Sequence, residues 1–290
     1  MAEPRPARTG IPPSAAVADR PAVVRGPVRR ALWLYRRSLG AKIRSVMEYE
    51  ADFWILMLAA VLTQGVGLVF LWTVFRRIPD INGWGFWEIV IVYAMVYLAE
   101  GVGSLFFEGT WRLAWLVNQG ELDRVLLRPF SPVLQVMSID VGLNGLGNIT
   151  MGIALLVAAV QQVDVAWSVG KVVLALVLLL SGIAVKIGLN LASNASAFWI
   201  NAPFSTFAFS LHSLGELARF PITIYALGIR AVITFVLPFA FVSFFPAAAV
   251  LGHGTSAWVG LLTPLVAAYC VGMGIWLFRR GLRRYESAGA

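Results

Sequence analysis

The sequence predicts an all-α integral membrane protein with six transmembrane helices. Of its 290 residues, 59% are hydrophobic and only 13% are charged, which is about half the charged share of an average soluble domain. Several runs reach the roughly 20 apolar residues that a helix needs to cross about 30 Å of hydrocarbon. Basic residues flank these runs, and ten of the 23 lysines and arginines precede Phe53. Such flanking charge is typical of membrane proteins rather than of nucleic-acid binders.

The chain begins with an arm and an amphipathic helix. Residues 1–27 are rich in Pro, Ala and Arg and lack the apolar region of a secretory signal, so we expect a disordered cytoplasmic arm. Within 28–50, Leu32, Tyr35 and Leu39 recur at three- and four-residue spacing, and arginines occupy the other faces. This pattern predicts a helix that lies in the membrane interface instead of crossing it.

The six-span membrane domain is expected over 53–278. Four of its spans follow directly from long apolar runs, at about 53–75, 86–107, 134–160 and 169–191. Trp54 and Trp72 lie near the two ends of the first run, where amphipathic rings favour the level of the lipid headgroups.

The segment before the last span has two interpretations. In the first, 194–218 is the fifth span and 221–250 is a re-entrant segment, because prolines interrupt its helix hydrogen bonds. Those prolines are Pro221, Pro238 and Pro246. In the second, 192–221 is cytoplasmic and 222–246 is the fifth span. Both interpretations place the sixth span at about 255–278.

Six crossings put both termini on the same side of the membrane. The ten basic residues near the N-terminus and four arginines in the tail over 279–290 assign that side to the cytoplasm. Arg76 and Arg77 then lie on the outer side, against the positive-inside rule, but the fourteen basic residues near the two termini outweigh them. The segment 108–132 follows two spans, so it also faces the cytoplasm.

The segment 108–132, EGTWRLAWLVNQGELDRVLLRPFSP, has charges and an apolar face of its own. Trp111 and Trp115 are four residues apart, which places them on one face of a helix. We expect a helix, a break at Asn118–Gly120 and a second short helix that ends at prolines. This pattern fits either an ordinary cytoplasmic loop with a solvated charged face or a docking element for a cytoplasmic partner.

Two motifs resemble a known family. GELDRVLLRPFSPVLQV, which begins at Gly120, resembles the segment after the second span in ABC-2 type permeases, most closely in their daunorubicin-resistance-like branch. ARFPITIYALGIRAVITFVLPFAFVSFFPAAAVLG, which begins at Ala218, resembles the run of spaced prolines and aromatic residues before the last span of that branch. The likeness extends from about residue 30 to the C-terminus.

The resemblance implies the six-span permease subunit of an ATP-binding cassette exporter in the bacterial plasma (inner) membrane. Such subunits pair with a second copy or a homologous permease, and they move a hydrophobic or amphiphilic substrate outward. The short helix between spans two and three would be the coupling helix, which sits in a groove of a separate ABC ATPase subunit. The residues expected to contact that ATPase are Trp111, Trp115, Glu121, Leu122, Asp123, Arg124, Leu126, Arg128 and Pro129.

The resemblance also favours the first topology, with 221–250 as the re-entrant segment near the outer exit. The residues that it places in this exit region are Pro221, Tyr225, Pro238 and Pro246. The nature of the substrate and the choice between a homodimer and a heterodimer stay open.

The chain itself lacks the signature of an ATP site. A phosphate-binding loop needs G-x-x-x-x-G-K-[ST], so that backbone amides surround the phosphates. The only Gly-Lys pair is Gly170–Lys171, and Val172 follows it. We therefore expect no bound cofactor and no catalytic activity here, with ATP and Mg held by the partner ATPase.

Three charged residues are expected inside the bilayer. Glu100, Asp140 and Lys186 fall toward the cytoplasmic ends of spans two, three and four. Because a charge at a helix centre costs roughly 2.5–3.5 kcal/mol on insertion scales, Lys186 is expected to pair with Glu100 or Asp140 as an intramembrane polar network. The alternative is that the side chains snorkel to the interface. Glycines near Gly101 and Gly145 favour close helix packing.

Other function classes receive less support. A single cysteine, Cys270, excludes a cysteine-based metal cluster, and His212 and His253 are far apart in sequence, so no metal is expected. A self-sufficient ion channel or ion-coupled carrier is the alternative, although neither inverted repeats nor a dense polar midplane is visible. A membrane enzyme would need a nucleophile beside a base, and no such arrangement stands out.

Overall fold

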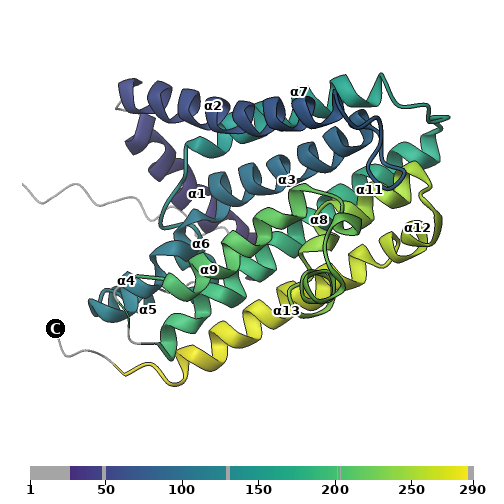
Figure 1. Cartoon of the computed structure of the whole chain (residues 1–290). Coiled ribbons are helices and arrows are strands. Elements are labelled where there is room, and N and C mark those ends of the chain that lie inside the picture. The colour runs from purple at the N-terminus through teal and green to yellow at the C-terminus, as the bar shows by residue number, and fades with distance from the viewer. Residues whose placement is uncertain (1–26, 48–49, 129–130, 201, 203, 287–290) are drawn as a thin grey trace, which may run out of the picture.

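A computed structural model describes residues 27–47, 50–128, 131–200, 202 and 204–286. Every regular element in these ranges is helical, and the helices lie roughly side by side as an elongated bundle (Figure 1). One end of the bundle carries the short helices α4 and α5 and the chain's C-terminal end, and it is called the module end below. The other end carries the loop between α2 and α3, together with α11 and α12, and it is called the loop end.

Within the described ranges, four helical runs are long and apolar enough to cross a bilayer. They contain α2 (Glu50–Phe75), α3 (Phe86–Phe107), α8 (Val169–Asn194) and α13 (Thr263–Leu282). The first three match the predicted spans one, two and four. The run that starts with α3 continues to Asn118 through η1 and α4, although Phe107, at the junction of α3 and η1, has non-helical dihedrals of φ −132° and ψ 18°.

The remaining elements are short, apart from α1 (Pro27–Met47) and α7 (Asn144–Val160). Those of the first half are η1 (Glu108–Arg112), α4 (Leu113–Asn118), α5 (Leu122–Leu126) and α6 (Pro132–Met137). Those that follow α8 are η2 (Ala195–Phe198), α9 (Thr206–Gly215), η3 (Glu216–Arg219), η4 (Ile222–Ile224), α10 (Leu227–Ala231), η5 (Val232–Val236), η6 (Phe239–Phe241), α11 (Phe244–Leu251) and α12 (Gly254–Gly260).

Two predicted spans are wrong as single helices. The range 134–160 is divided into α6 and α7 by a non-helical turn, where Gly142 N–H donates to Ser104 O at 3.0 Å instead of continuing a helix. The range 255–278 is divided into α12 and α13, and Pro264 lies in the first turn of α13. Proline has no N–H to donate, so it starts a helix more readily than it continues one.

Neither interpretation of the fifth span is a continuous helix. The chain returns from the module end to the loop end through the short elements α9 to α11 (Figure 1). Pro221 and Pro238 each immediately precede a short helix, η4 and η6, and Pro246 lies in the first turn of α11. These prolines therefore divide 221–250, as their spacing predicts, but the pass is also broken between η2 and α9, where none of the three lies.

Glycines allow two helix pairs to approach closely. On α3 and α7, a Cβ added to Gly101 would lie 2.8 Å from Gly145 O. On α8 and α13, a Cβ added to Gly188 would lie 2.5 Å from the carbonyl carbon of Cys270. Because lipid gives no hydrophobic drive between helices, such backbone contact is a main source of association in membranes.

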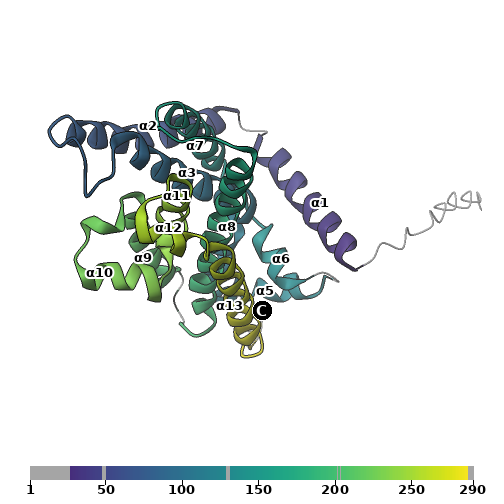
Figure 2. The ribbon, with the colours of Figure 1, turned by 90° about the vertical axis from the view of Figure 1, so that its right-hand side faces the viewer.

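The amphipathic helix α1 lies on the flank of the bundle, beside α6 (Figure 2). Its inward face places Leu39 against Leu105 and Leu143, while arginines such as Arg36 are exposed. Tyr35 O–H donates to Phe106 O, and burial raises the pKa of this phenol to about 12, so it stays a donor at neutral pH. The predicted helix ends at Met47, and residues 1–26 of the predicted arm lie outside the described ranges.

At the loop end, one polar cluster ties the α2–α3 loop to the turn between α11 and α12. Trp84 stacks on the His253 ring at 4.2 Å, and His253 Nε2 lies 2.9 Å from Glu88 Oε1. The other carboxylate oxygen of Glu88 accepts the Gly85 N–H at 2.8 Å at the start of α3. His253 thus has a structural place here, far from His212.

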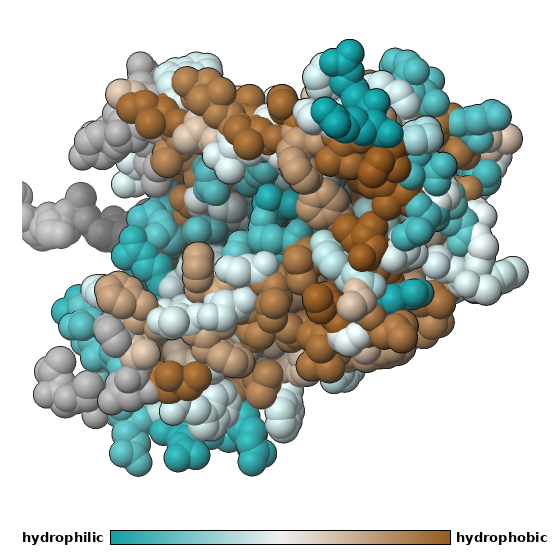
Figure 3. Space-filling view, in the orientation of Figure 1, coloured by the Kyte–Doolittle hydropathy of each residue, from teal (hydrophilic) through white to brown (hydrophobic). Residues whose placement is uncertain are grey.

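The surface of the bundle is mostly apolar. Figure 3 shows hydrophobic residues across the middle of the visible face, and hydrophilic residues in a recess between α2 and α7 above and α9 below. The helix α2 is especially exposed, because only 17% of its most apolar 18-residue stretch is buried within the chain. A helix with so little protein contact requires lipid or another subunit around it.

Candidate functional site

The centre of the candidate site is a buried ion pair between two long helices. Lys186 on α8 is only 5% exposed, and its Nζ pairs with Glu100 Oε1 on α3. The ammonium group also lies 5.6 Å from the centre of the Phe239 ring, which offers further cation–π stabilisation. The two charges therefore compensate each other in an environment where either one alone would be strongly unfavourable.

A third helix connects this pair to the segment 108–132. His212 on α9 places its Nδ1 3.4 Å from Lys186 Nζ. The Trp111 ring, in η1, meets the His212 ring edge-on at 5.3 Å between centroids. Trp111, His212, Lys186 and Glu100 thus form one continuous chain of contacts across η1, α9, α8 and α3.

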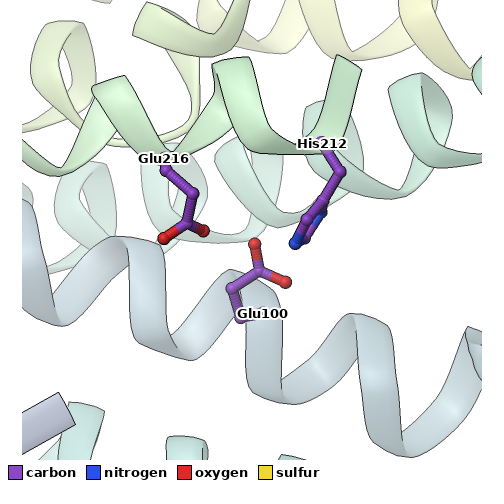
Figure 4. Close-up of side chains that lie close together, drawn as sticks. All are labelled: Glu100, His212 and Glu216. Carbon is purple, nitrogen blue, oxygen red and sulfur yellow. The ribbon is translucent and has the colours of Figure 1, made fainter. Parts of the chain in front are cut away.

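Glu216 completes a cluster of three possible metal ligands. One ligand atom from each of Glu100, His212 and Glu216 lies within 4.8 Å of the others, and Figure 4 shows the Glu100 carboxylate directed toward the two residues above it. However, Lys186 pairs with Glu100, and Arg219 pairs with Glu216. Two cations already balance two carboxylates, so this arrangement does not favour a metal ion.

A polar cavity of about 260 Å³ opens beside the buried pair. It extends from Glu100 and Lys186 to the start of the 108–132 segment, and its lining includes Glu108 and Trp111. Its amides come from Asn144, Asn148 and Asn190. A second cavity of about 180 Å³ shares Lys186, Asn190 and His212 with it and is more apolar. The charged cluster therefore borders two cavities, toward the module end, that are large enough to hold water.

Asp140 does not meet Lys186. It lies in the turn between α6 and α7, where its Oδ2 accepts Arg112 Nε–H at 2.8 Å and its Oδ1 lies 3.5 Å from Lys42 Nζ. The prediction that placed Asp140 inside a span at the level of Lys186 is wrong, because the helix is broken at this point; of the two partners expected for Lys186, it is Glu100 that pairs with it. Asp140 instead links η1 to the interfacial helix α1.

The segment 108–132 has one face packed on the bundle and one face exposed. Leu113 and Leu122 are fully buried, and their apolar cluster includes Phe198 of η2 and Phe278 of α13. Gly120 has φ +70°, which glycine adopts readily, and it makes the predicted break between α4 and α5. Leu122 is therefore an internal support and is not available to a partner.

The exposed face carries four of the nine predicted docking residues, Trp115, Arg124, Leu126 and Arg128, with Glu121 half-buried beside them. Trp115 is 44% exposed, and Leu126 and Leu127 also face outward. Arg124 pairs with Glu121 at 3.0 Å at the surface, and Arg128 is exposed. Trp111 is turned inward to His212, whereas Trp115 is exposed. The two side chains therefore have different surroundings, although their four-residue spacing predicted a shared face. Pro129 lies outside the described residues.

The C-terminal end of the chain touches the same segment. Tyr285, just beyond α13, lies beside the Asp123 carboxylate of α5. Partial burial and this negative charge both raise the pKa of the Tyr285 phenol. Asp123 is thus engaged within the chain, and α5 is held against the C-terminal part of α13 and the residues that follow it.

The predicted exit residues lie in the broken fifth pass. Pro221, Pro238 and Pro246 are all buried. Tyr225 O–H donates to Leu217 O at 3.0 Å and so holds η4 against η3.

The sequence interpretation missed His212, Glu216 and Arg219. A signal was present, because His212 and Glu216 are four residues apart and Arg219 follows three later, so they share one helix face. The two candidate topologies divide this range between a span and a loop, so the sequence alone does not define one helix face that carries all three residues.

Comparison with protein families gives one match. Residues 61–289 match the family described as ABC-2 family transporter protein, which is more than three quarters of the chain. Comparison with curated proteins and with solved structures gave no match. The matched range includes the long apolar helices from α3 onward, the segment 108–132 and the buried cluster. The chain therefore belongs to the ABC-2 transporter family and is a multi-pass membrane permease component.

Proposed function

We propose that this chain is the membrane subunit of an exporter driven by a separate ABC ATPase, and that the segment 108–132 couples the two. The family match is the observation that carries the proposal. The substrate would be hydrophobic or amphiphilic and would move outward. ATP and Mg would be bound by the ATPase.

The geometry supports a coupling role for 108–132. The segment extends α3 directly, since the helical run Phe86–Asn118 continues through η1 and α4. A force that the ATPase exerts on the exposed face of this segment would therefore be transmitted along α3. The same force would act on Trp111 and, through His212, on the Lys186–Glu100 pair. Both routes lead to the polar cavity between α3 and α8.

The proposal includes a topology. Six passes along the bundle, with the fifth in short pieces, would place both termini and the module end in the cytoplasm of a bacterial cell. The exposed α2 and the exposed side of α10 and η5 would then face lipid or a second permease, either a copy of this chain or a homologue. The segment 221–250 would be re-entrant near the outer exit.

We expect co-purification to reveal the ATPase. The full chain, tagged and extracted in mild detergent, should retain an ABC ATPase supplied by co-expression, and the eluate should hydrolyse ATP. The variant Trp115→Ala, Arg124→Glu, Arg128→Glu should lose most of the bound ATPase, because these exposed groups would form the contact. None of them lies in the apolar core, so the variant should fold.

The matched control changes Arg76 and Arg77 to Glu at the loop end, where both side chains are exposed. It should retain the ATPase at the wild-type level. If the wild-type chain retains no ATPase, or if both variants retain it equally, the segment 108–132 is not the coupling element.

One observation favours a second candidate, a self-sufficient ion-coupled carrier. The buried groups Glu100, Lys186 and His212 border a cavity, and titratable groups inside membranes commonly mark proton or ion paths. Purified chain in liposomes without any ATPase would separate the two. Proton or cation flux in such liposomes would support the carrier, whereas the exporter predicts none.

A further inference from the structure

A large cavity lies away from the site above. It has a volume of about 620 Å³, within the range of roughly 300–1,000 Å³ typical of ligand pockets. One wall is formed by α10 and η5, and the opposite wall by α12 and the first half of α13. Figure 2 shows α10 standing off to the side of α12 and α13.

The cavity combines an apolar wall with a single cation. Phe235, Phe245 and Val266 contribute apolar surface. Arg230 also lines it, and within the described ranges this guanidinium has no carboxylate, aromatic or hydrogen-bond partner. Arg230 is exposed on the protein alone, so in a bilayer its charge would face lipid, which is unfavourable unless it meets an anion or water.

Hydroxyl groups surround the same space. Thr255 and Ser256 of α12 line the cavity, and so does Tyr269 of α13. Thr234 of η5 is 8% exposed, and its hydroxyl finds no partner in the described part of the chain. These groups can donate hydrogen bonds to an oxyanion. Together with the guanidinium they suit a phosphate or carboxylate attached to something apolar.

The backbone of this wall is unusual. From Val232 to Val236 the chain forms a π-helical turn, in which Leu237 N–H donates to Val232 O at 2.8 Å. Such turns are rare and are frequently found at functional sites. The wider turn ends before Pro238, which has no N–H to continue the helix and also lines the cavity.

We propose that this cavity binds the anionic headgroup of a membrane lipid, with Arg230 as the counter-ion and the acyl chains lying along the exposed apolar side of α10 and η5. Leu227 and Phe235 there are 82% and 83% exposed, which suits contact with hydrocarbon. A guanidinium binds the phosphate of a lipid headgroup through charge-assisted hydrogen bonds that can be bidentate. The inference goes beyond the proposed function, since it concerns binding that needs no ATP.

The test measures lipid retention by the full chain in detergent. The protein is incubated with equal amounts of phosphatidylglycerol and phosphatidylcholine that carry identical acyl chains, washed by dilution, and analysed by native mass spectrometry. Wild type should retain phosphatidylglycerol in preference. Arg230→Gln should retain about tenfold less of it, as expected from the loss of a charge-assisted hydrogen bond. Arg230→Lys should retain most of the preference.

The matched control is Arg76→Gln, an exposed arginine of the loop end that lies over Trp72 and lines no described cavity. It should behave as wild type. The proposal would be overturned if wild type retained the two lipids equally. It would also be overturned if Arg230→Gln and Arg76→Gln lost phosphatidylglycerol to the same extent. Displacement of the lipid by millimolar inorganic phosphate would also overturn it, because the site would then recognise free phosphate. None of these outcomes depends on an ATPase.

Discussion

Replacing Lys186 by Met should strongly destabilise the protein. The change leaves the Glu100 carboxylate buried without its cation, and removing one partner of a buried pair costs about 3–5 kcal/mol. For a chain of this size we expect the midpoint of thermal unfolding in detergent, at a fixed heating rate, to fall by on the order of 10 °C. Scanning fluorimetry of the tryptophans would report the change.

The double variant Lys186→Met, Glu100→Gln should recover most of that loss. A neutral amide is far less costly to bury than an isolated carboxylate. Lys171→Met is the matched control, since this lysine lies at the start of the same helix and has no ion pair in the described ranges. If the double variant is no more stable than Lys186→Met, direct pairing is not the source of the stabilisation.

Replacing Gly188 by Ala should separate α8 from α13. The added Cβ would lie 2.5 Å from the carbonyl carbon of Cys270 and 2.6 Å from Val271 N, and neither backbone atom can rotate away. Overpacking of this kind typically costs 1–3 kcal/mol, and more where backbone must shift. Gly274 faces the same crossing, with its added Cβ 2.8 Å from Gly188 O.

Gly272→Ala on α13 is the control for this substitution. No atom lies within 4 Å of a Cβ added at Gly272, and alanine favours a helix over glycine by up to about 1 kcal/mol. We therefore expect Gly272→Ala to be neutral or stabilising in the same melting assay. A melting point for Gly188→Ala equal to that of wild type would show that the crossing is not as tight as the structure has it.

Hydropathy predicted the long helices well. A helix surrounded by lipid must form all its backbone hydrogen bonds internally and present apolar residues to the lipid, so its sequence is a long apolar run. The ends of α2 and α3 and the start of α8 lie within about three residues of their predicted positions. The break at Gly120 was also predictable, since the residue stands between two short amphipathic runs. These features depend on local sequence.

Features that depend on tertiary contacts were not predictable. The break between α6 and α7 is stabilised by a hydrogen bond from Gly142 to Ser104, a residue 38 positions earlier on another helix. Depth along a helix suggested a common level for Asp140 and Lys186, but Asp140 is instead bound by Arg112. The partner of a charge depends on which helices are neighbours, and hydropathy carries no information on that.

The central claim is that the exposed face of 108–132 lies against an ABC ATPase. Its most direct test is a cross-link from Leu127→Cys, which is 85% exposed in the wild-type chain, to a co-expressed ATPase subunit. The native Cys270 is buried and need not be removed. Phe235→Cys, at a similarly exposed site on η5, is the comparison. We predict a cross-linked product from position 127 and none from position 235. A product from 235 alone, or none from 127 in membranes where the ATPase is present, would contradict the claim.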